Sequence, residues 1–168
     1  TGRPGTGKSE LAERIAWELG LGPVLRFEAQ SLTEAQELFY RFDLVAQMAD
    51  AHLTPEGEKP QVAESYLTFG ALGRAILYAN PLAHAELIEF DHRNERTLDG
   101  ASPIAESLAQ SPSSSGHGLQ PRRSVVLIDE IDKAARDVPN DLLNGIERMA
   151  FRIRELRNRL VAAPSDES

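Results

Sequence analysis

The residues best suited to chemistry form two short groups that are far apart along the chain. The first is the opening run Gly2-Arg-Pro-Gly-Thr-Gly-Lys8-Ser9, which fits the pattern G-x-x-x-x-G-K-[ST]. Glycines in such a loop let backbone N–H groups curl around phosphate oxygens, and a following helix adds partial positive charge at its N-terminus. Lys8 can neutralise β- and γ-phosphates, and the Ser9 hydroxyl is a hard oxygen ligand for Mg²⁺.

The second group is the run Val125-Val-Leu-Ile-Asp129-Glu130. A carboxylate at the end of an apolar run is costly unless a cation or hydrogen-bond donors stabilise it. Asp129 is therefore the candidate to hold Mg²⁺, directly or through water, opposite Ser9. Glu130 points the other way if the backbone stays extended, which makes it the candidate to polarise a water in line with the γ-phosphate. A plain glycine-rich turn and an ordinary acidic helix cap are the alternatives, and the presence of both groups disfavours them.

Hydrophobic periodicity predicts the elements that must position these two groups. Residues 24–29 alternate in polarity, which predicts a strand that is wet on part of one side and lies at an edge. The apolar run 125–128 predicts a strand covered on both faces, and hence a parallel sheet. The glycine-rich turn leads into a helix with an apolar stripe made of Leu11, Ala12, Ile15, Ala16 and Leu19.

The remaining periodic segments predict further helices. One covers residues 31–51, because Ser31 and Glu34 have capping-box spacing and an apolar stripe follows them. Others cover 70–80 and 84–90. A last helix begins near Asp137 and Pro139 and has the apolar residues Leu142, Leu143, Ile146 and Met149.

Polar stretches separate or end these elements. Residues 91–121 are rich in serine, glycine and proline, which predicts a flexible insertion. Residues 164–168 are predicted to be a disordered tail, so the domain itself covers 1–163. Five arginines between 148 and 159 are expected to form a solvated segment that pairs with Glu147, Glu155 and the acidic tail. The alternative is that they contact a neighbouring subunit or an anionic partner.

Composition narrows the classes of function. The chain has 168 residues, a net charge of −8 and no cysteine, which excludes a disulfide scaffold, a thiolate zinc site and a cysteine nucleophile. The acidic balance opposes non-specific contact with nucleic acid or anionic lipid. No run approaches the roughly 18 apolar residues of a membrane span. The lack of cysteine fits a reducing compartment, and a cytoplasmic location is expected. The chain begins at Thr1 without an initiator Met, which suggests an excerpt of a longer protein.

The two groups together resemble the Walker A and Walker B motifs of the AAA+ ATPases. The runs Tyr66-x-x-x-Gly70-Ala-Leu-Gly73, Pro139-Asn-Asp-Leu-Leu-Asn144 and Phe151-Arg-Ile-Arg-Glu-Leu156 further resemble the MoxR-like branch of that family. The resemblance covers about 1–80 and 124–160. It implies an α/β fold, the three-layer P-loop NTPase sandwich with a parallel sheet, here incomplete because the first strand, the sensor-1 strand and the lid have no counterpart in the chain.

The resemblance also assigns roles to particular residues. It implies that Glu130 and Lys8 are catalytic and that Ser9 and Asp129 serve Mg²⁺. The ATP-binding set that it implies is Gly2, Pro4, Gly5, Thr6, Gly7, Lys8, Ser9 and Glu10. The implied activity is Mg²⁺-dependent ATP hydrolysis by a homo-oligomeric ring that remodels a partner protein, whose identity the sequence does not give.

Two other functions stay open at this point. One is a nucleotide-binding switch without turnover, and the other is a P-loop kinase. The adjacent carboxylates of Asp129 and Glu130 disfavour the kinase, because a base for water is what a hydrolase needs. We also expect the isolated chain to be unstable and a weak catalyst, since the strand that would anchor the phosphate loop is missing from it.

Overall fold

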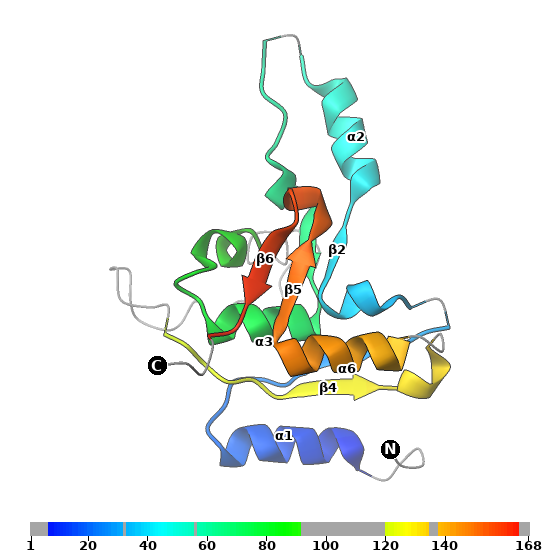
Figure 1. Cartoon of the computed structure of the whole chain (residues 1–168), viewed down its shortest axis with the longest axis vertical. Helices are drawn as coiled ribbons and strands as arrows, with labels where there is room; N and C mark the ends of the chain where they lie inside the picture. The colour runs from blue at the N-terminus through cyan, green and yellow to red at the C-terminus, as the bar shows by residue number, and fades with distance from the viewer. Residues whose placement is uncertain (1–6, 32, 56, 92–119, 135–137, 165–168) are drawn as a thin grey trace.

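The computed structural model describes residues 7–31, 33–55, 57–91, 120–134 and 138–164. Its central unit has three layers. Strand β1 (Leu25–Glu28) pairs in parallel with β4 (Val126–Asp129), with Leu25 opposite Val126. Helix α1 (Lys8–Glu18) lies on one side of this pair and helix α3 (Ala71–Ala79) on the other (Figure 1). The predicted α/β sandwich with a parallel sheet is confirmed in this incomplete form.

Helix α1 faces the sheet with its smallest side chains. Ala12 and Ala16 are buried, whereas the larger apolar residues of the predicted stripe, Leu11, Ile15 and Leu19, are exposed. The helix contacts β4, and short side chains at the contact let two backbones approach closely. The predicted helix is therefore correct, but only its alanines enter the packed layer.

The two paired strands differ in how they are covered. Exposure alternates along β1, with Arg26 and Glu28 exposed and Leu25 and Phe27 half-buried, as the alternating sequence predicts. Both α1 and α3 contact β4, yet all four β4 residues keep partial exposure. The expectation that β4 is fully covered on both faces is therefore not met within the described residues.

The predicted continuous helix over 31–51 is wrong. In its place the chain forms the 3₁₀ helix η1 (Ala35–Leu38), strand β2 (Tyr40–Phe42) and helix α2 (Leu44–Leu53). Glu34, rather than Ser31, begins the capping box, together with Glu37. Asp43 then starts a second helix, because its Oδ1 accepts a hydrogen bond from the Ala46 N–H. Tertiary pairing of the intervening residues with another strand overrides their helical spacing.

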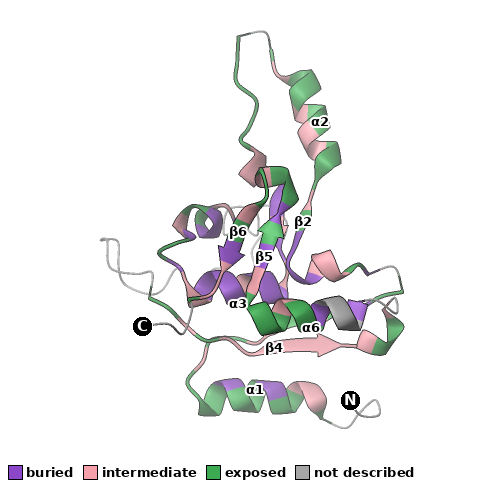
Figure 2. Ribbon diagram, viewed as in Figure 1, coloured by how far each residue is buried: buried purple, intermediate pink, exposed green. Residues whose placement is uncertain are grey.

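That other strand is β3 (Leu67–Phe69), which pairs antiparallel with β2 and follows the 3₁₀ helix η2 (Ala63–Tyr66). Helix α2 and its connecting loop project away from the body between these two strands (Figure 1). No residue of α2 is buried, as its green and pink colouring shows in Figure 2. The Tyr66 hydroxyl donates to Asp50 Oδ2 at 2.7 Å and ties the projection to its base.

The third pair of strands is a hairpin that sequence reasoning missed. Helix α6 (Val138–Arg148), which was predicted, leads into β5 (Ala150–Ile153), the 3₁₀ helix η4 (Arg154–Leu156) and β6 (Arg159–Ala162). The ring of Phe151 lies at the centre of the core. Its centroid is 5.2 Å, 6.0 Å and 6.4 Å from those of Phe39, Tyr40 and Phe69 respectively.

The surroundings of this hairpin depart from the sequence predictions in two ways. Leu142 of α6 is buried, whereas Leu143, Ile146 and Met149 are exposed. Two of the five arginines have described partners other than Glu147 and Glu155. Arg159 pairs with Glu86 at 3.4 Å, and Arg152 donates to the Asn158 carbonyl at 3.0 Å.

A buried ion pair marks the end of the predicted helix over 84–90, which the structure confirms as helical residues 85–91. The Asp91 carboxylate is 1% exposed and receives hydrogen bonds from Arg74 at 2.9 and 3.2 Å and from the Phe69 N–H at 3.3 Å. Asp91 therefore belongs to the folded core, although the sequence analysis places it at the start of the insertion. The rest of that predicted insertion lies largely outside the described residues, as does the tail after Pro164. No helix in the described ranges is long and apolar enough to cross a membrane.

Two glycines let α3 approach the backbone of the preceding segment. A Cβ built on Gly73 would lie 1.9 Å from the Phe39 carbonyl oxygen, and one on Gly70 would lie 2.2 Å from that of Glu37. Both contacts are with backbone atoms, which cannot rotate away. Glycine at these positions is thus a packing requirement for placing α3 against the β2–β3 layer.

We expect Gly73→Ala to destabilise the protein by about 2 kcal/mol or more, since overpacking a rigid core typically costs 1–3 kcal/mol. Gly22→Ala is the matched control, because a Cβ there has no atom within 4 Å. Urea denaturation followed by circular dichroism measures both variants. Equal stability of the two variants would contradict the close approach of α3.

Candidate functional site

The first part of the candidate site is the N-terminal end of α1. Gly7 precedes the helix with φ of 75°, a left-handed conformation that favours glycine. Lys8 and Ser9 follow in the first turn and are half-buried, and Glu10 is exposed beside them. The aligned peptide dipoles of a helix make this end of α1 partly positive. The predicted residues Gly2, Pro4, Gly5 and Thr6 lie outside the described residues.

The second part is the carboxyl end of β4. Asp129 is its last residue, and Asp129 Oδ1 accepts a hydrogen bond from the Glu130 N–H at 3.0 Å. Glu130 has φ of 55° and begins the 3₁₀ helix η3 (Ile131–Lys133). The assumption that Glu130 continues an extended backbone is therefore wrong. The chain turns at Glu130 because the Asp129 side chain holds its amide, so strand alternation does not set where its carboxylate points.

Glu130 has a partner that the sequence analysis did not identify. The Lys133 ammonium donates to Glu130 Oε2 at 2.5 Å, and both side chains are partly exposed. This hydrogen bond is the main cause of a raised pKa of Lys133. Spacing of i and i+3 between opposite charges was a signal that could have predicted the contact.

The two parts of the site lie at the same end of the molecule. Helix α1 contacts β4, and its N-terminal end lies on the same side as the arrowhead of β4 (Figure 1). This arrangement brings the end of α1 that contains Lys8 and Ser9 toward the end of β4 that contains Asp129 and Glu130. The charges are complementary, since a partly positive helix end with an ammonium lies at the same end of the molecule as two carboxylates.

The donor set fits Mg²⁺ that arrives with a phosphate ligand. Mg²⁺ prefers hard oxygen ligands and is usually held by one or two protein groups, with waters and phosphates completing its octahedral shell. The Ser9 hydroxyl and the Asp129 carboxylate are groups of that kind. Within the described ranges no cluster of three or more His, Cys, Asp or Glu residues could hold a metal by itself.

Fold and site together define an α/β nucleotide-binding domain. The entire chain, residues 1–168, matches the family model of the AAA domain (dynein-related subfamily), so the chain belongs to the AAA family. Membership confirms the predicted AAA+ assignment and supports nucleotide binding, with ATPase activity as the family's general function. A search of curated proteins and a search of solved structures gave no match.

We expect Glu130→Gln to lower the pKa of Lys133 toward its ordinary value of 10.5, because an amide no longer stabilises the ammonium as a carboxylate does. The raised pKa means that this pair contributes stability below the unfolded-state pKa and loses it as pH rises through the folded-state value. Titration of the lysine side-chain nitrogen by NMR measures the change. Asp132→Asn is the control, since Asp132 contributes only the smallest of the effects that raise the Lys133 pKa. An equal drop in both variants would contradict the specific contact.

Proposed function

We propose that the chain is the ATP-hydrolysing module of a MoxR-like AAA+ protein, which acts as one subunit of a homo-oligomeric ring and remodels a partner protein. One observation supports this most directly. The N-terminal end of α1 and the carboxyl end of β4 lie at one end of a parallel strand pair, with Lys8 and Ser9 on the first and Asp129 and Glu130 on the second.

Each residue of the site has a role in this proposal. The ATP phosphates bind the backbone of the opening loop and the first turn of α1, and the Lys8 ammonium neutralises their charge. Ser9 and Asp129 would hold Mg²⁺, which when bound offsets negative charge on the phosphates. The remaining members of the ATP-binding set are Gly2, Pro4, Gly5, Thr6, Gly7 and Glu10.

Glu130 acts as the general base in the proposed reaction. Its carboxylate accepts a proton from the attacking water as the oxygen of that water bonds to the γ-phosphorus and the bond to the bridging oxygen breaks. ADP and inorganic phosphate are the products. Glu130 currently pairs with Lys133, but exposed ion pairs contribute little free energy. The carboxylate can therefore exchange Lys133 for a water at small cost.

Two other functions predict different behaviour of the same site. A nucleotide-binding switch needs the phosphate cradle but no base, and a P-loop kinase passes the phosphoryl group to a small molecule instead of water. The Glu130 carboxylate beside Asp129, the candidate Mg²⁺ ligand, favours hydrolysis over both the switch and the kinase, because it can act as a base for water. Release of inorganic phosphate by the full-length protein distinguishes hydrolysis from the other two functions.

We expect Glu130→Gln to keep ATP binding within about threefold and to lower phosphate release about a hundredfold or more, the usual contribution of a general base. A phosphate-release assay and a fluorescent ATP analogue measure the two properties. Asp132→Asn removes an equal charge two residues away and should keep the parental rate. Parental turnover by Glu130→Gln would exclude Glu130 as the base.

We expect Lys8→Ala to weaken ATP binding at least about tenfold, because hydrogen bonds to charged groups are each worth roughly 1.5–3 kcal/mol. Lys59→Ala is the control, since Lys59 is an exposed lysine outside the site. Isothermal titration calorimetry with a non-hydrolysable ATP analogue gives both affinities. An unchanged affinity of Lys8→Ala would remove the phosphate-cradle assignment.

A further inference from the structure

Strand β1 has one edge that no described strand covers. Its hydrogen bonds to β4 use alternate residues, with the Leu25 N–H donating to Val125 at 2.9 Å and the Ala29 N–H to Asp129 at 3.0 Å. In a parallel ladder the intervening residues, Arg26 and Glu28, direct their backbone N–H and C=O groups to the opposite side. Within the described ranges no other strand pairs with β1.

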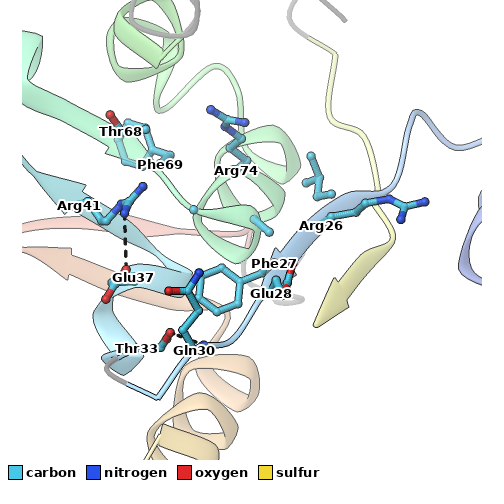
Figure 3. A pocket seen from close by; sticks show the side chains of 13 residues that line it. Arg26, Phe27, Glu28, Gln30, Thr33, Glu37, Arg41, Thr68, Phe69 and Arg74 are labelled. Atoms are coloured by element: carbon cyan, nitrogen blue, oxygen red, sulfur yellow. Dashed lines mark hydrogen bonds and ion pairs between the residues drawn. The ribbon is translucent and has the colours of Figure 1, made fainter. Parts of the chain in front are cut away.

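A cavity of about 400 Å³ runs beside this strand. Phe27 and Phe69 provide apolar surface in its lining, and Arg41 and Thr68 of the β2–β3 strand pair contribute a polar side (Figure 3). This strand pair therefore bounds the space next to β1. One extended chain fits such a space more readily than the whole sheet of a second folded copy.

The wall of the cavity is already fixed in place. Arg74 lines it and is held by the buried Asp91 through two hydrogen bonds, at 2.9 and 3.2 Å. Asp91 also accepts the Phe69 N–H. Because a buried ion pair with several hydrogen bonds resists rearrangement, an entering chain meets a preformed surface and little ordering cost arises on the protein's side.

The side chains of β1 indicate which sequence fits. Arg26 and Glu28 lie on one face of the strand and are exposed, whereas Phe27 lies on the other and is half-buried. In an antiparallel pair, the residues opposite Glu28 and Arg26 share the exposed face with them. A partner chain would then place a basic residue opposite Glu28, an apolar residue opposite Phe27 and an acidic residue opposite Arg26. The Arg26 guanidinium already pairs with Glu13 of α1, so the acidic residue would share this cation with Glu13.

We propose that the free edge of β1 binds an extended segment of a partner polypeptide with this basic, apolar, acidic alternation, by addition of an antiparallel strand. The backbone N–H and C=O groups of Arg26 and Glu28 supply the hydrogen bonds, and the cavity receives the apolar side chain of the partner segment. This surface is separate from the residues assigned to ATP, so the inference goes beyond the proposed function and does not depend on it.

The test uses the full-length protein and a fluorescein-labelled peptide, acetyl-Ser-Thr-Lys-Val-Glu-Thr-Ser-amide, with fluorescence anisotropy as the readout. We expect saturable binding that ATP does not compete away. Methylating the lysine backbone nitrogen of the peptide removes a hydrogen bond to β1 and should weaken binding at least tenfold. Methylating the valine nitrogen, which faces away from β1, should change binding less than threefold.

Variants of the protein provide the second arm of the test. Glu28→Pro removes an outward N–H without removing a hydrogen bond to β4, which is the kind of edge position that accepts proline. It should lower peptide affinity at least tenfold, whereas Glu28→Gln, which keeps the N–H, should lower it less. Circular dichroism and ATP affinity, both expected to be unchanged, establish that Glu28→Pro is folded.

Several outcomes would overturn the inference. They are no binding at 1 mM peptide by the folded wild-type protein, equal losses for the two methylated peptides, displacement by ATP, and full binding by Glu28→Pro. A concentration-dependent dimer that Glu28→Pro abolishes and the peptide does not disrupt would instead assign the edge to a second copy of the chain.

Discussion

The parallel ladder between β1 and β4 is the interaction on which the arrangement of the site depends. It joins segments that are far apart along the chain, and it pairs Leu25 with Val126 and Glu28 with Asp129. Parallel pairing makes both carboxyl ends point the same way, and α1 and α3 then cover the two sides. The candidate Mg²⁺ ligand Asp129 is thereby placed at the end of the sheet where the helix that contains Lys8 begins.

Elements that depend on local spacing could be predicted from the sequence, and elements that depend on distant partners could not. The periodicity of α1 and α3 and the alternation of β1 are properties of short windows, and each matches the structure. The segment 31–51 has helical spacing as well, but Tyr40 and Phe42 pair with β3. The β5–β6 hairpin pairs locally and was missed for another reason, because its turn has Arg157 and Asn158 at positive φ in place of the glycine that commonly marks a hairpin.

The candidate site also has features that the sequence predicts and features that it does not. Its residue types were predictable because glycines, a lysine, a hydroxyl and two carboxylates at set spacings have few other uses together. The orientation of Glu130 was not predictable. A non-glycine residue with positive φ is uncommon, and here the turn depends on a hydrogen bond to the preceding aspartate. The Glu130 carboxylate then pairs with Lys133, a contact that follows from the turn and not from strand alternation.

The α2 projection leaves through one strand and returns through the next, and none of the helix is buried. The projection is therefore joined to the rest of the molecule by the strands β2 and β3 at its two ends and by the hydrogen bond between Tyr66 and Asp50 at its base. Such an element can gain, lose or exchange residues over generations at almost no cost in folding free energy. The sequence of α2 is in this way separated from the packing of the central core, and the two can diversify at different speeds.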